Sequence, residues 1–184
     1  CPSQGNCGKS SETCGIQSNP DNHIKNIITV MSGKGGVGKS TVTVMLAKAM
    51  AKKGLKVGIM DADITGPSIP RLLALSNEHA FGNEKQQLIP VDSKEGIKVM
   101  SLNFLVQSES DPVIWRGPVI GGVVKQFYTD VVWGDLDVLL IDMPPGTGDV
   151  ALTIMQSIPV QGVVMVSTPQ PMVSMIVEKA CHMC

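Results

Sequence analysis

Gly33-Lys34-Gly35-Gly36-Val37-Gly38-Lys39-Ser40-Thr41 is the most informative segment of this sequence. Residues 27–31 precede it as a short apolar run with several β-branched members, which predicts a buried parallel strand. Apolar residues with helical spacing follow it, at Val42, Met45, Leu46, Ala49 and Met50. The sequence therefore places a glycine-rich loop between a buried strand and an amphipathic helix.

This loop fits the phosphate-binding pattern Gly33-x4-Gly38-Lys39-Ser40. Its glycines let backbone N–H groups converge on phosphate oxygens, Lys39 adds a positive charge, and the Ser40 hydroxyl can ligate Mg²⁺. The helix N-terminus adds a partial positive charge. We therefore expect the loop to bind the phosphates of a nucleotide.

A dinucleotide-binding fingerprint is the rival interpretation, because Gly33, Gly35 and Gly38 also satisfy it. Asp61 lies near the position expected of its ribose-binding acid. That fingerprint requires no Lys-Ser pair after its third glycine, and it does not account for the segment 142–146 after a later strand. The context favours the phosphate loop.

Strands and helices alternate along the rest of the chain. We expect further strands at residues 55–60, 97–102, 138–141 and 162–167, and helices at residues 117–131, 149–157 and from 172 onward. This alternation predicts an α/β fold with a mainly parallel sheet and helices on both faces. Residues 23–184 should form this domain, truncated at its C-terminus, and residues 1–22 a flexible, cysteine-containing leader.

Three aspartates, Asp61, Asp63 and Asp142, fall at or just past the ends of predicted strands, where open α/β sheets bind ligands. Each could instead be a helix cap or a turn residue. Phosphoryl transfer to water needs Mg²⁺ and a group that orients the water. We assign Asp142 to the Mg²⁺ shell with Ser40, Asp63 to the water, and Asp61 to either role.

Residues 64–68 and 143–149 are dense in glycine and proline and should lie near the terminal phosphate. They are either switch loops that a triphosphate orders or simple tight turns. Pro144 and Gly146 are the expected nucleotide contacts in the second segment. Lys34, an extra lysine in the phosphate loop, is either a solvated cation or a group that reaches a nucleotide phosphate, in its own subunit or in a second one.

The composition of the chain limits the classes of partner that it is expected to bind. The chain has 184 residues, 43% of them hydrophobic, which suits one globular domain. Its 15 basic and 16 acidic residues give a net charge of -1 with no basic block, so we expect no nucleic-acid partner. No apolar run approaches the roughly 18 residues of a membrane span, and no signal-peptide pattern opens the chain. We expect a cytoplasmic protein with no membrane partner.

The loop at residues 33–41, with its extra Lys34, resembles the deviant Walker A motif of the MinD/ParA/nitrogenase-iron-protein class. The segments 61–70 and 142–149 resemble the Mrp/ApbC (Nbp-type) iron–sulfur cluster carriers, and the resemblance runs from residue 24 to the chain end. It implies a homodimer that binds ATP and Mg²⁺, hydrolyses ATP slowly, and carries [4Fe–4S] clusters to apoproteins.

The resemblance also implies roles for single residues. Lys34 would act across the dimer, Lys39 and Ser40 would bind phosphate and Mg²⁺, and Asp63 would orient water. The nucleotide contacts would be Gly33, Lys34, Gly35, Gly36, Val37, Gly38, Lys39, Ser40, Thr41, Asp61, Asp142, Pro144 and Gly146. Two alternatives share these motifs: ATP-driven electron transfer, as in the nitrogenase iron protein, and a MinD/ParA-like positioning ATPase without metal.

The five cysteines are an odd number in an expected cytosolic chain, which argues against a disulfide framework. Residues 1–7 are similar to the end of an N-terminal cluster motif in Nbp-type relatives, so Cys1, Cys7 and Cys14 are candidate cluster ligands. The family's Cys-x-x-Cys usually lies past residue 184. Cys181 and Cys184 share one face of a predicted helix and are either metal ligands or core residues.

Overall fold

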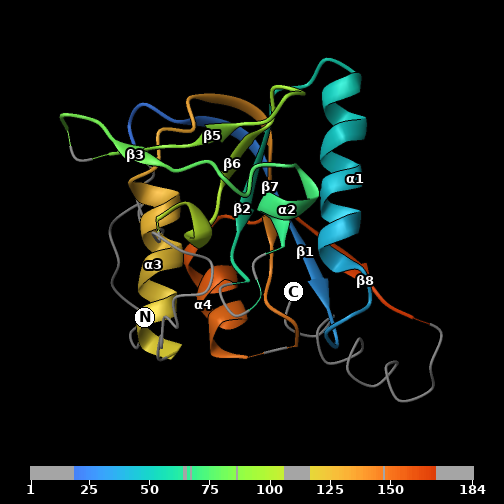
Figure 1. The fold of residues 1–184 in the computed structure, drawn as a ribbon. Coiled ribbons are helices and arrows are strands. Elements are labelled where there is room, and N and C mark those ends of the chain that lie inside the picture. The colour runs from blue at the N-terminus through green and yellow to red at the C-terminus, as the bar shows by residue number, and fades with distance from the viewer. Residues whose placement is uncertain are drawn as a thin grey trace.

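A computed structural model describes residues 19–63, 66, 68–85, 87–105, 117–146 and 148–168, with backbone alone for residues 117–120, 149 and 150 (Figure 1). The predicted leader up to residue 18 and the predicted helix from residue 172 lie outside these ranges. No helix within them has both the length and the apolar character needed to cross a membrane.

The structure is organised around a six-stranded sheet with the order β5-β6-β2-β7-β1-β8. Its strands are β1 (His23–Ser32), β2 (Val57–Asp61), β5 (Val91–Asp92), β6 (Lys98–Met100), β7 (Asp135–Asp142) and β8 (Gly162–Val166). All neighbours pair in parallel except β5, which is antiparallel to β6. The predicted mainly parallel sheet is therefore confirmed.

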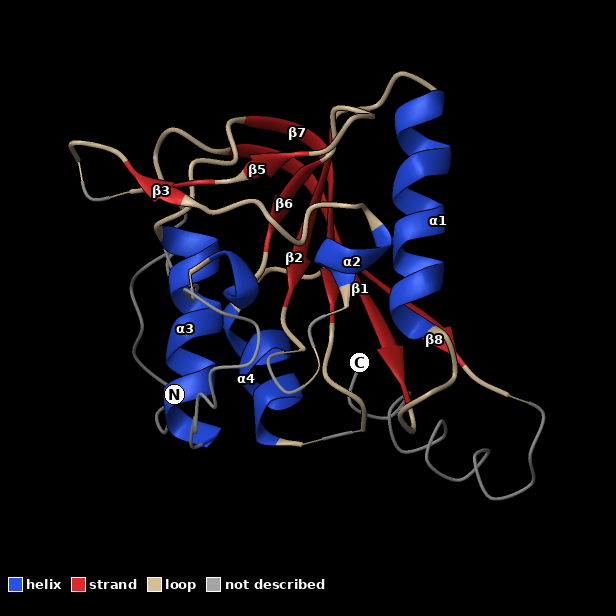
Figure 2. Cartoon of the chain, viewed as in Figure 1, coloured by secondary structure: helices blue, strands red, loops and turns tan. Residues whose placement is uncertain are grey.

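Helices cover both faces of this sheet, as Figures 1 and 2 show: α1 lies on one side, and α3 and α4 lie together on the other. The helices are α1 (Lys39–Lys52), α2 (Ile69–Leu72), α3 (Gly117–Thr129) and α4 (Asp149–Ser157). Strand β7 supplies both cores, because Leu139 and Ile141 pack toward the α3–α4 side and Val138 and Leu140 toward α1 and α2. The predicted α/β fold is confirmed.

Residues 76–96, between the predicted strands at residues 55–60 and 97–102, contain short strands that the sequence analysis does not predict. Besides β5, this segment holds β3 (Phe81–Gly82) and β4 (Leu88–Ile89), which pair antiparallel as a second, two-stranded sheet. Strands of two residues are too short to show an alternating pattern. Packing and backbone hydrogen bonds, which the sequence does not display, define them.

The predicted apolar face of α1 is only partly confirmed: Leu46 and Met50 pack half-buried against the core, but the fully buried positions are others. The side chains buried on this helix are those of Lys39, Thr43, Val44 and Ala47, whereas Met45 is 66% exposed. Apolar residues occur around most of α1, so their spacing defines the face poorly. Polar contacts at the start of the helix turn Lys39 and Thr43 inward.

Strand β2 packs closely on the α3–α4 side at Gly58. A Cβ atom there would lie 2.6 Å from Leu136 Cδ1 and 3.2 Å from Trp133 Cε3. We expect Gly58→Ala to destabilise the fold by about 1–3 kcal/mol, because the core must shift to admit a methyl group. Gly122→Ala on α3 is the matched control, since its Cβ would meet nothing within 4 Å. Urea unfolding that gave both variants equal stability would contradict this packing.

Three parallel strands, β1, β2 and β7, lie side by side and end at the same edge of the sheet. Asp142 pairs with Val30 of β1 on one side and with Asp61 of β2 on the other. Helix α1 begins at this edge directly after the glycine-rich loop. The topology thus brings the loop and the aspartates together, although they are up to about a hundred residues apart in sequence.

Candidate functional site

The glycine-rich loop runs from the end of β1 to the first residue of α1. Gly36 and Gly38 have φ angles of +75° and +86°, in the left-handed region that other residues rarely adopt. Cβ atoms built at Gly35, Gly36 and Gly38 would meet no atom within 4 Å. The loop therefore presents bare backbone to an open side, which suits the close approach of a phosphate group.

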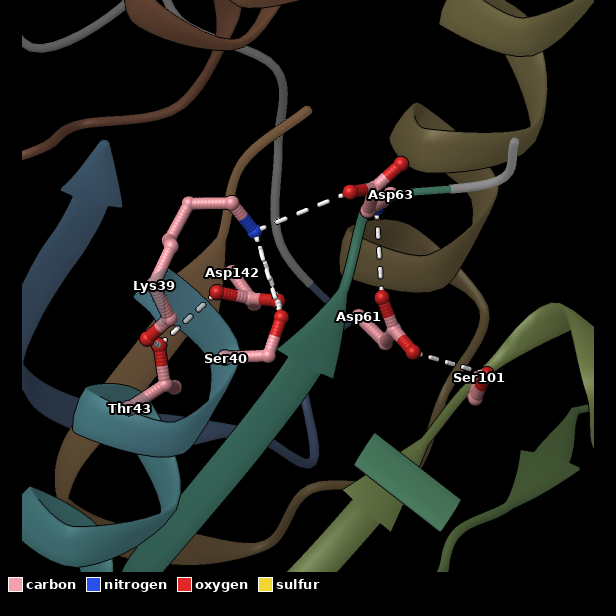
Figure 3. A network of polar contacts seen from close by, with 7 residues as sticks. All are labelled: Lys39, Ser40, Thr43, Asp61, Asp63, Ser101 and Asp142. Atoms are coloured by element: carbon pink, nitrogen blue, oxygen red, sulfur yellow. Dashed lines mark hydrogen bonds and ion pairs between the residues drawn. The ribbon is translucent and has the colours of Figure 1, made fainter. Parts of the chain in front are cut away.

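Lys39 and Asp142 form the centre of the site (Figure 3). Lys39 is only 6% exposed, and its Nζ lies 2.8 Å from Oδ2 of the fully buried Asp142. Ser40 Oγ donates to the same carboxylate at 2.6 Å, and Thr43 Oγ1 donates to its other oxygen at 2.8 Å. A buried carboxylate is thus held by an ammonium group and two hydroxyls from the first turns of α1.

Asp63 lies at the rim of this cluster, just past the end of β2. Its Oδ2 is 3.8 Å from Lys39 Nζ, and Figure 3 shows the two side chains pointing toward each other. Its side chain is more exposed than those of Lys39 and Asp142, at 14%. Asp63 is therefore the carboxylate of this group that bulk water reaches most readily.

Asp61 is the second fully buried acid, 1% exposed. Its Oδ1 accepts a hydrogen bond from the Asp63 backbone N–H at 3.2 Å, and its Oδ2 accepts one from Ser101 Oγ at 3.1 Å. Burial, together with the nearby negative charge of Asp142, raises the pKa of Asp61 to about 8. The two aspartates paired across β2 and β7 thus have different environments.

The raised pKa of Asp61 predicts a pH-dependent stability. Between about pH 4 and pH 8 the folded state retains a proton that the unfolded state has lost, so stability falls as the pH rises through this window. We expect Asp61→Asn to remove this fall, worth up to about 1.4 kcal/mol per pH unit. Urea unfolding of both proteins in EDTA, from about pH 5 to about pH 8, measures it. Parallel profiles would contradict the raised pKa.

The remaining predicted site residues lie around the cluster. Lys34 and Val37 are half-buried in the loop, Thr41 is exposed on α1, and Pro144 is half-buried after β7. The Gly146 N–H donates to the Ser32 carbonyl oxygen at 2.8 Å, which ties the segment after β7 to the base of the loop. The sequence-predicted residues at the ends of β1, β2 and β7 are therefore brought together.

The candidate cluster ligands Cys1, Cys7 and Cys14, like Cys181 and Cys184, lie outside the described residues. Within the described ranges, no three or more His, Cys, Asp or Glu side chains are grouped to hold a metal ion by themselves. Residues 64, 65, 67 and 147 of the predicted switch segments also lie outside the described ranges.

Sequence reasoning missed two side chains of the site, Thr43 and Ser101. Thr43 belongs to the helix that follows the loop, and its hydroxyl reaches Asp142. Ser101 directly follows β6, at the edge of the sheet where β2 and β7 also end. The signal that could have identified Ser101 is its place as a polar residue at the end of a strand, like Asp61 and Asp142.

Three features together define a P-loop nucleotide-binding domain. They are a glycine-rich loop before a helix, a buried lysine at the first helical position, and an aspartate at the end of a neighbouring strand. The sequence model described as ParA, "NUBPL iron-transfer P-loop NTPase", matches residues 23–184. The chain belongs to this family, and the resemblance inferred from its motifs is confirmed. The dinucleotide-binding alternative is thereby excluded.

Several relatives are similar over most of the chain. An "Iron-sulfur cluster carrier protein" of Clostridium perfringens is 50% identical over 100% of this chain and 69% of its own length. One of Methanocaldococcus jannaschii is 47% identical, over 100% of this chain and 64% of its own length. The "Iron-sulfur cluster transfer protein NUBPL" of Dictyostelium discoideum is 52% identical, over 80% and 45%. The chain thus spans about half to two thirds of these relatives.

Solved structures agree with this placement. A nucleotide-binding protein from Archaeoglobus fulgidus, in complex with ADP, is 50% identical with a TM-score of 0.75, over 87% of this chain and 61% of that one. The cell division ATPase MinD of Pyrococcus furiosus is 21% identical with a TM-score of 0.56, over 85% and 65%. The second similarity supports the fold alone.

Proposed function

We propose that this chain is the nucleotide-binding part of an ATP-dependent carrier that delivers [4Fe–4S] clusters to apoproteins. The contact of Lys39 Nζ with Asp142 Oδ2, at the mouth of an open P-loop, is the observation that carries the nucleotide half of this proposal. The names of the relatives that are about 50% identical support the cluster half.

ATP is the proposed substrate of the P-loop. The backbone N–H groups of residues 33–38 and the start of α1 would donate to its phosphate oxygens. The Lys39 ammonium, now held by Asp142, would donate to the β- and γ-phosphates. A buried lysine already placed at the first residue of α1 loses little side-chain freedom when it makes this contact.

The donor atoms of the site fit Mg²⁺. Ser40 Oγ and Asp142 Oδ2 are hard oxygen donors only 2.6 Å apart, and Mg²⁺ is typically held by one or two protein oxygens together with phosphates and water. Bound Mg²⁺ would neutralise charge on the phosphate oxygens during transfer. Asp63, which is more exposed than Lys39 and Asp142, would orient the attacking water. Hydrolysis would be slow.

The proposed assembly is a homodimer. Lys34 lies half-buried in the loop, beside the phosphate site of its own subunit. A long lysine side chain at this position would reach a phosphate held by a second copy of the chain. We place the protein in the cytoplasm, a proposal supported by a Drosophila ananassae relative named "Cytosolic Fe-S cluster assembly factor Nubp2 homolog", which is 45% identical.

Iron and acid-labile sulfide analysis of the full-length protein, purified without oxygen, tests the cluster half. We expect iron and sulfide in equal amounts, about four of each per cluster. A variant with Cys1, Cys7 and Cys14 all replaced by serine tests the N-terminal ligands, and it should contain less of both. Absence of iron and sulfide from the wild type would contradict the proposal and favour a positioning ATPase without metal.

A further inference from the structure

We propose that Ser101 is a positioning residue for Asp63 and acts through Asp61; this inference deepens the proposed function and rests on it. In Figure 3 Ser101 lies on the far side of Asp61 from Lys39. Its hydroxyl donates to Asp61, and Asp61 in turn accepts the backbone N–H of Asp63. The three residues form a chain from the end of β6 to the rim of the phosphate site (Figure 3).

The sheet itself fixes Ser101 beside Asp61. Strands β2 and β6 are parallel, and their last pair is Met60 with Met100. The next residue is Asp61 in one segment and Ser101 in the other, so the two are neighbours. Ser101 is completely buried, and its carbonyl oxygen accepts the Phe104 N–H at the start of the short 3-10 helix η2 (Leu102–Phe104). The donor therefore sits on rigid backbone, as a positioning group requires.

The position of the Asp61 carboxyl needs such a donor. Asp61 pairs with Asp142 in the β2–β7 register, so two buried acids lie on neighbouring strands. Each oxygen of the Asp61 carboxyl accepts one hydrogen bond, so loss of either donor would allow the carboxyl to rotate about its side-chain bond. The Ser101 hydroxyl holds one carboxyl oxygen, which leaves the other directed at the Asp63 N–H.

The position of Asp63 depends on these two hydrogen bonds of Asp61. Strand β2 ends at Asp61, and Asp63 lies two residues beyond it. The Asp63 carboxylate is 3.8 Å from Lys39 Nζ. The hydrogen bond from its own N–H to Asp61 Oδ1 sets the direction in which the chain leaves β2. The sequence leaves two roles open to Asp61, a place in the Mg²⁺ shell or the orientation of water. The geometry points to a third role, the link between Ser101 and Asp63.

Ser101→Ala tests this role against Ser93→Ala as the matched control. Ser93 is also a buried serine next to β6, but its hydroxyl accepts the N–H groups of Glu95 and Ile97 in a turn at the other end of the strand. In the full-length protein we expect Ser101→Ala to lower kcat for ATP roughly 10- to 100-fold with KM unchanged, since only the water-orienting group is displaced. Ser93→Ala should change neither constant.

Hydrogen–deuterium exchange without nucleotide gives an independent readout. The peptide spanning residues 61–66 should exchange faster in Ser101→Ala than in the wild type or Ser93→Ala, because the Asp63 amide loses its fixed acceptor. Unchanged exchange, unchanged kcat, or equal effects of the two serine variants would overturn the inference. If Ser101→Ala does not fold, Ser101→Cys, similar in size with a weaker donor, takes its place. A wild type without ATP turnover would overturn the proposed function instead, and the exchange comparison alone would then decide the inference.

Discussion

Lys39→Ala is expected to abolish MgATP binding, with a loss of affinity of roughly 100-fold or more, because removing one partner of a buried charge contact costs about 2–5 kcal/mol or more. Lys39 is the buried cation of the P-loop, and its Nζ already lies in the site, 2.8 Å from Asp142. Isothermal titration calorimetry with MgATP measures the effect. Equal affinity of the wild type and the variant would show that the phosphate site is assigned wrongly.

Lys48→Ala is the matched control for this variant. Lys48 lies on the same helix, but it is exposed and forms a surface ion pair with Glu95 at 2.7 Å. We expect its replacement to leave MgATP affinity unchanged and to alter stability by less than about 1 kcal/mol. Lys39→Ala also leaves the buried Asp142 without its counter-ion, which should destabilise the fold by about 3 kcal/mol. Thermal unfolding of the variant must therefore show that it is folded during the titration.

Asp142→Asn is expected to lower Mg²⁺-dependent ATP hydrolysis by roughly 100- to 1,000-fold. The substitution keeps the shape of the side chain and removes the negative charge that the Ser40 hydroxyl and the Lys39 ammonium both contact. Nucleotide affinity should also lose most of its dependence on Mg²⁺. Steady-state hydrolysis and calorimetry with and without Mg²⁺ measure the two effects.

Asp137→Asn provides the same chemical change at the other end of the same strand. Asp137 pairs with the exposed Lys25 at 2.7 Å and lies at the opposite edge of the sheet from the P-loop. Its replacement should leave hydrolysis unchanged. Hydrolysis that fell equally in both variants, or that survived in Asp142→Asn, would contradict the assignment of Asp142 to the Mg²⁺ shell.

The sequence was sufficient to predict the elements that a local pattern specifies. The loop at residues 33–41 carries its own motif, and β7 is an apolar run that ends in Asp142, so both the P-loop and its neighbouring carboxylate could be found without coordinates. Parallel strands end at one edge of a sheet, so grouping Asp61, Asp63 and Asp142 followed from the alternation of strands and helices.

Contacts between distant segments could not be predicted in the same way. The hydrogen bond from Ser101 to Asp61 depends on which strands are neighbours, and the order β6-β2-β7 is not encoded in any short pattern. The inward turn of Thr43 depends on the carboxylate of Asp142, 99 residues further along the chain. Strand β5 exists only because β6 offers it an edge for backbone pairing.

Cluster transfer with and without MgATP shows whether the nucleotide controls delivery of the cluster. Full-length protein loaded with its iron–sulfur cluster would be mixed with an apo iron–sulfur protein, and the recovery of that protein's cluster followed by its absorbance. We expect MgATP to change the transfer rate of the wild type and to leave that of Lys39→Ala unchanged, since Lys39 is the proposed phosphate-binding cation. A wild-type rate that is the same with and without MgATP would contradict an ATP-dependent carrier, and so would ATP-driven reduction of an acceptor in place of cluster transfer.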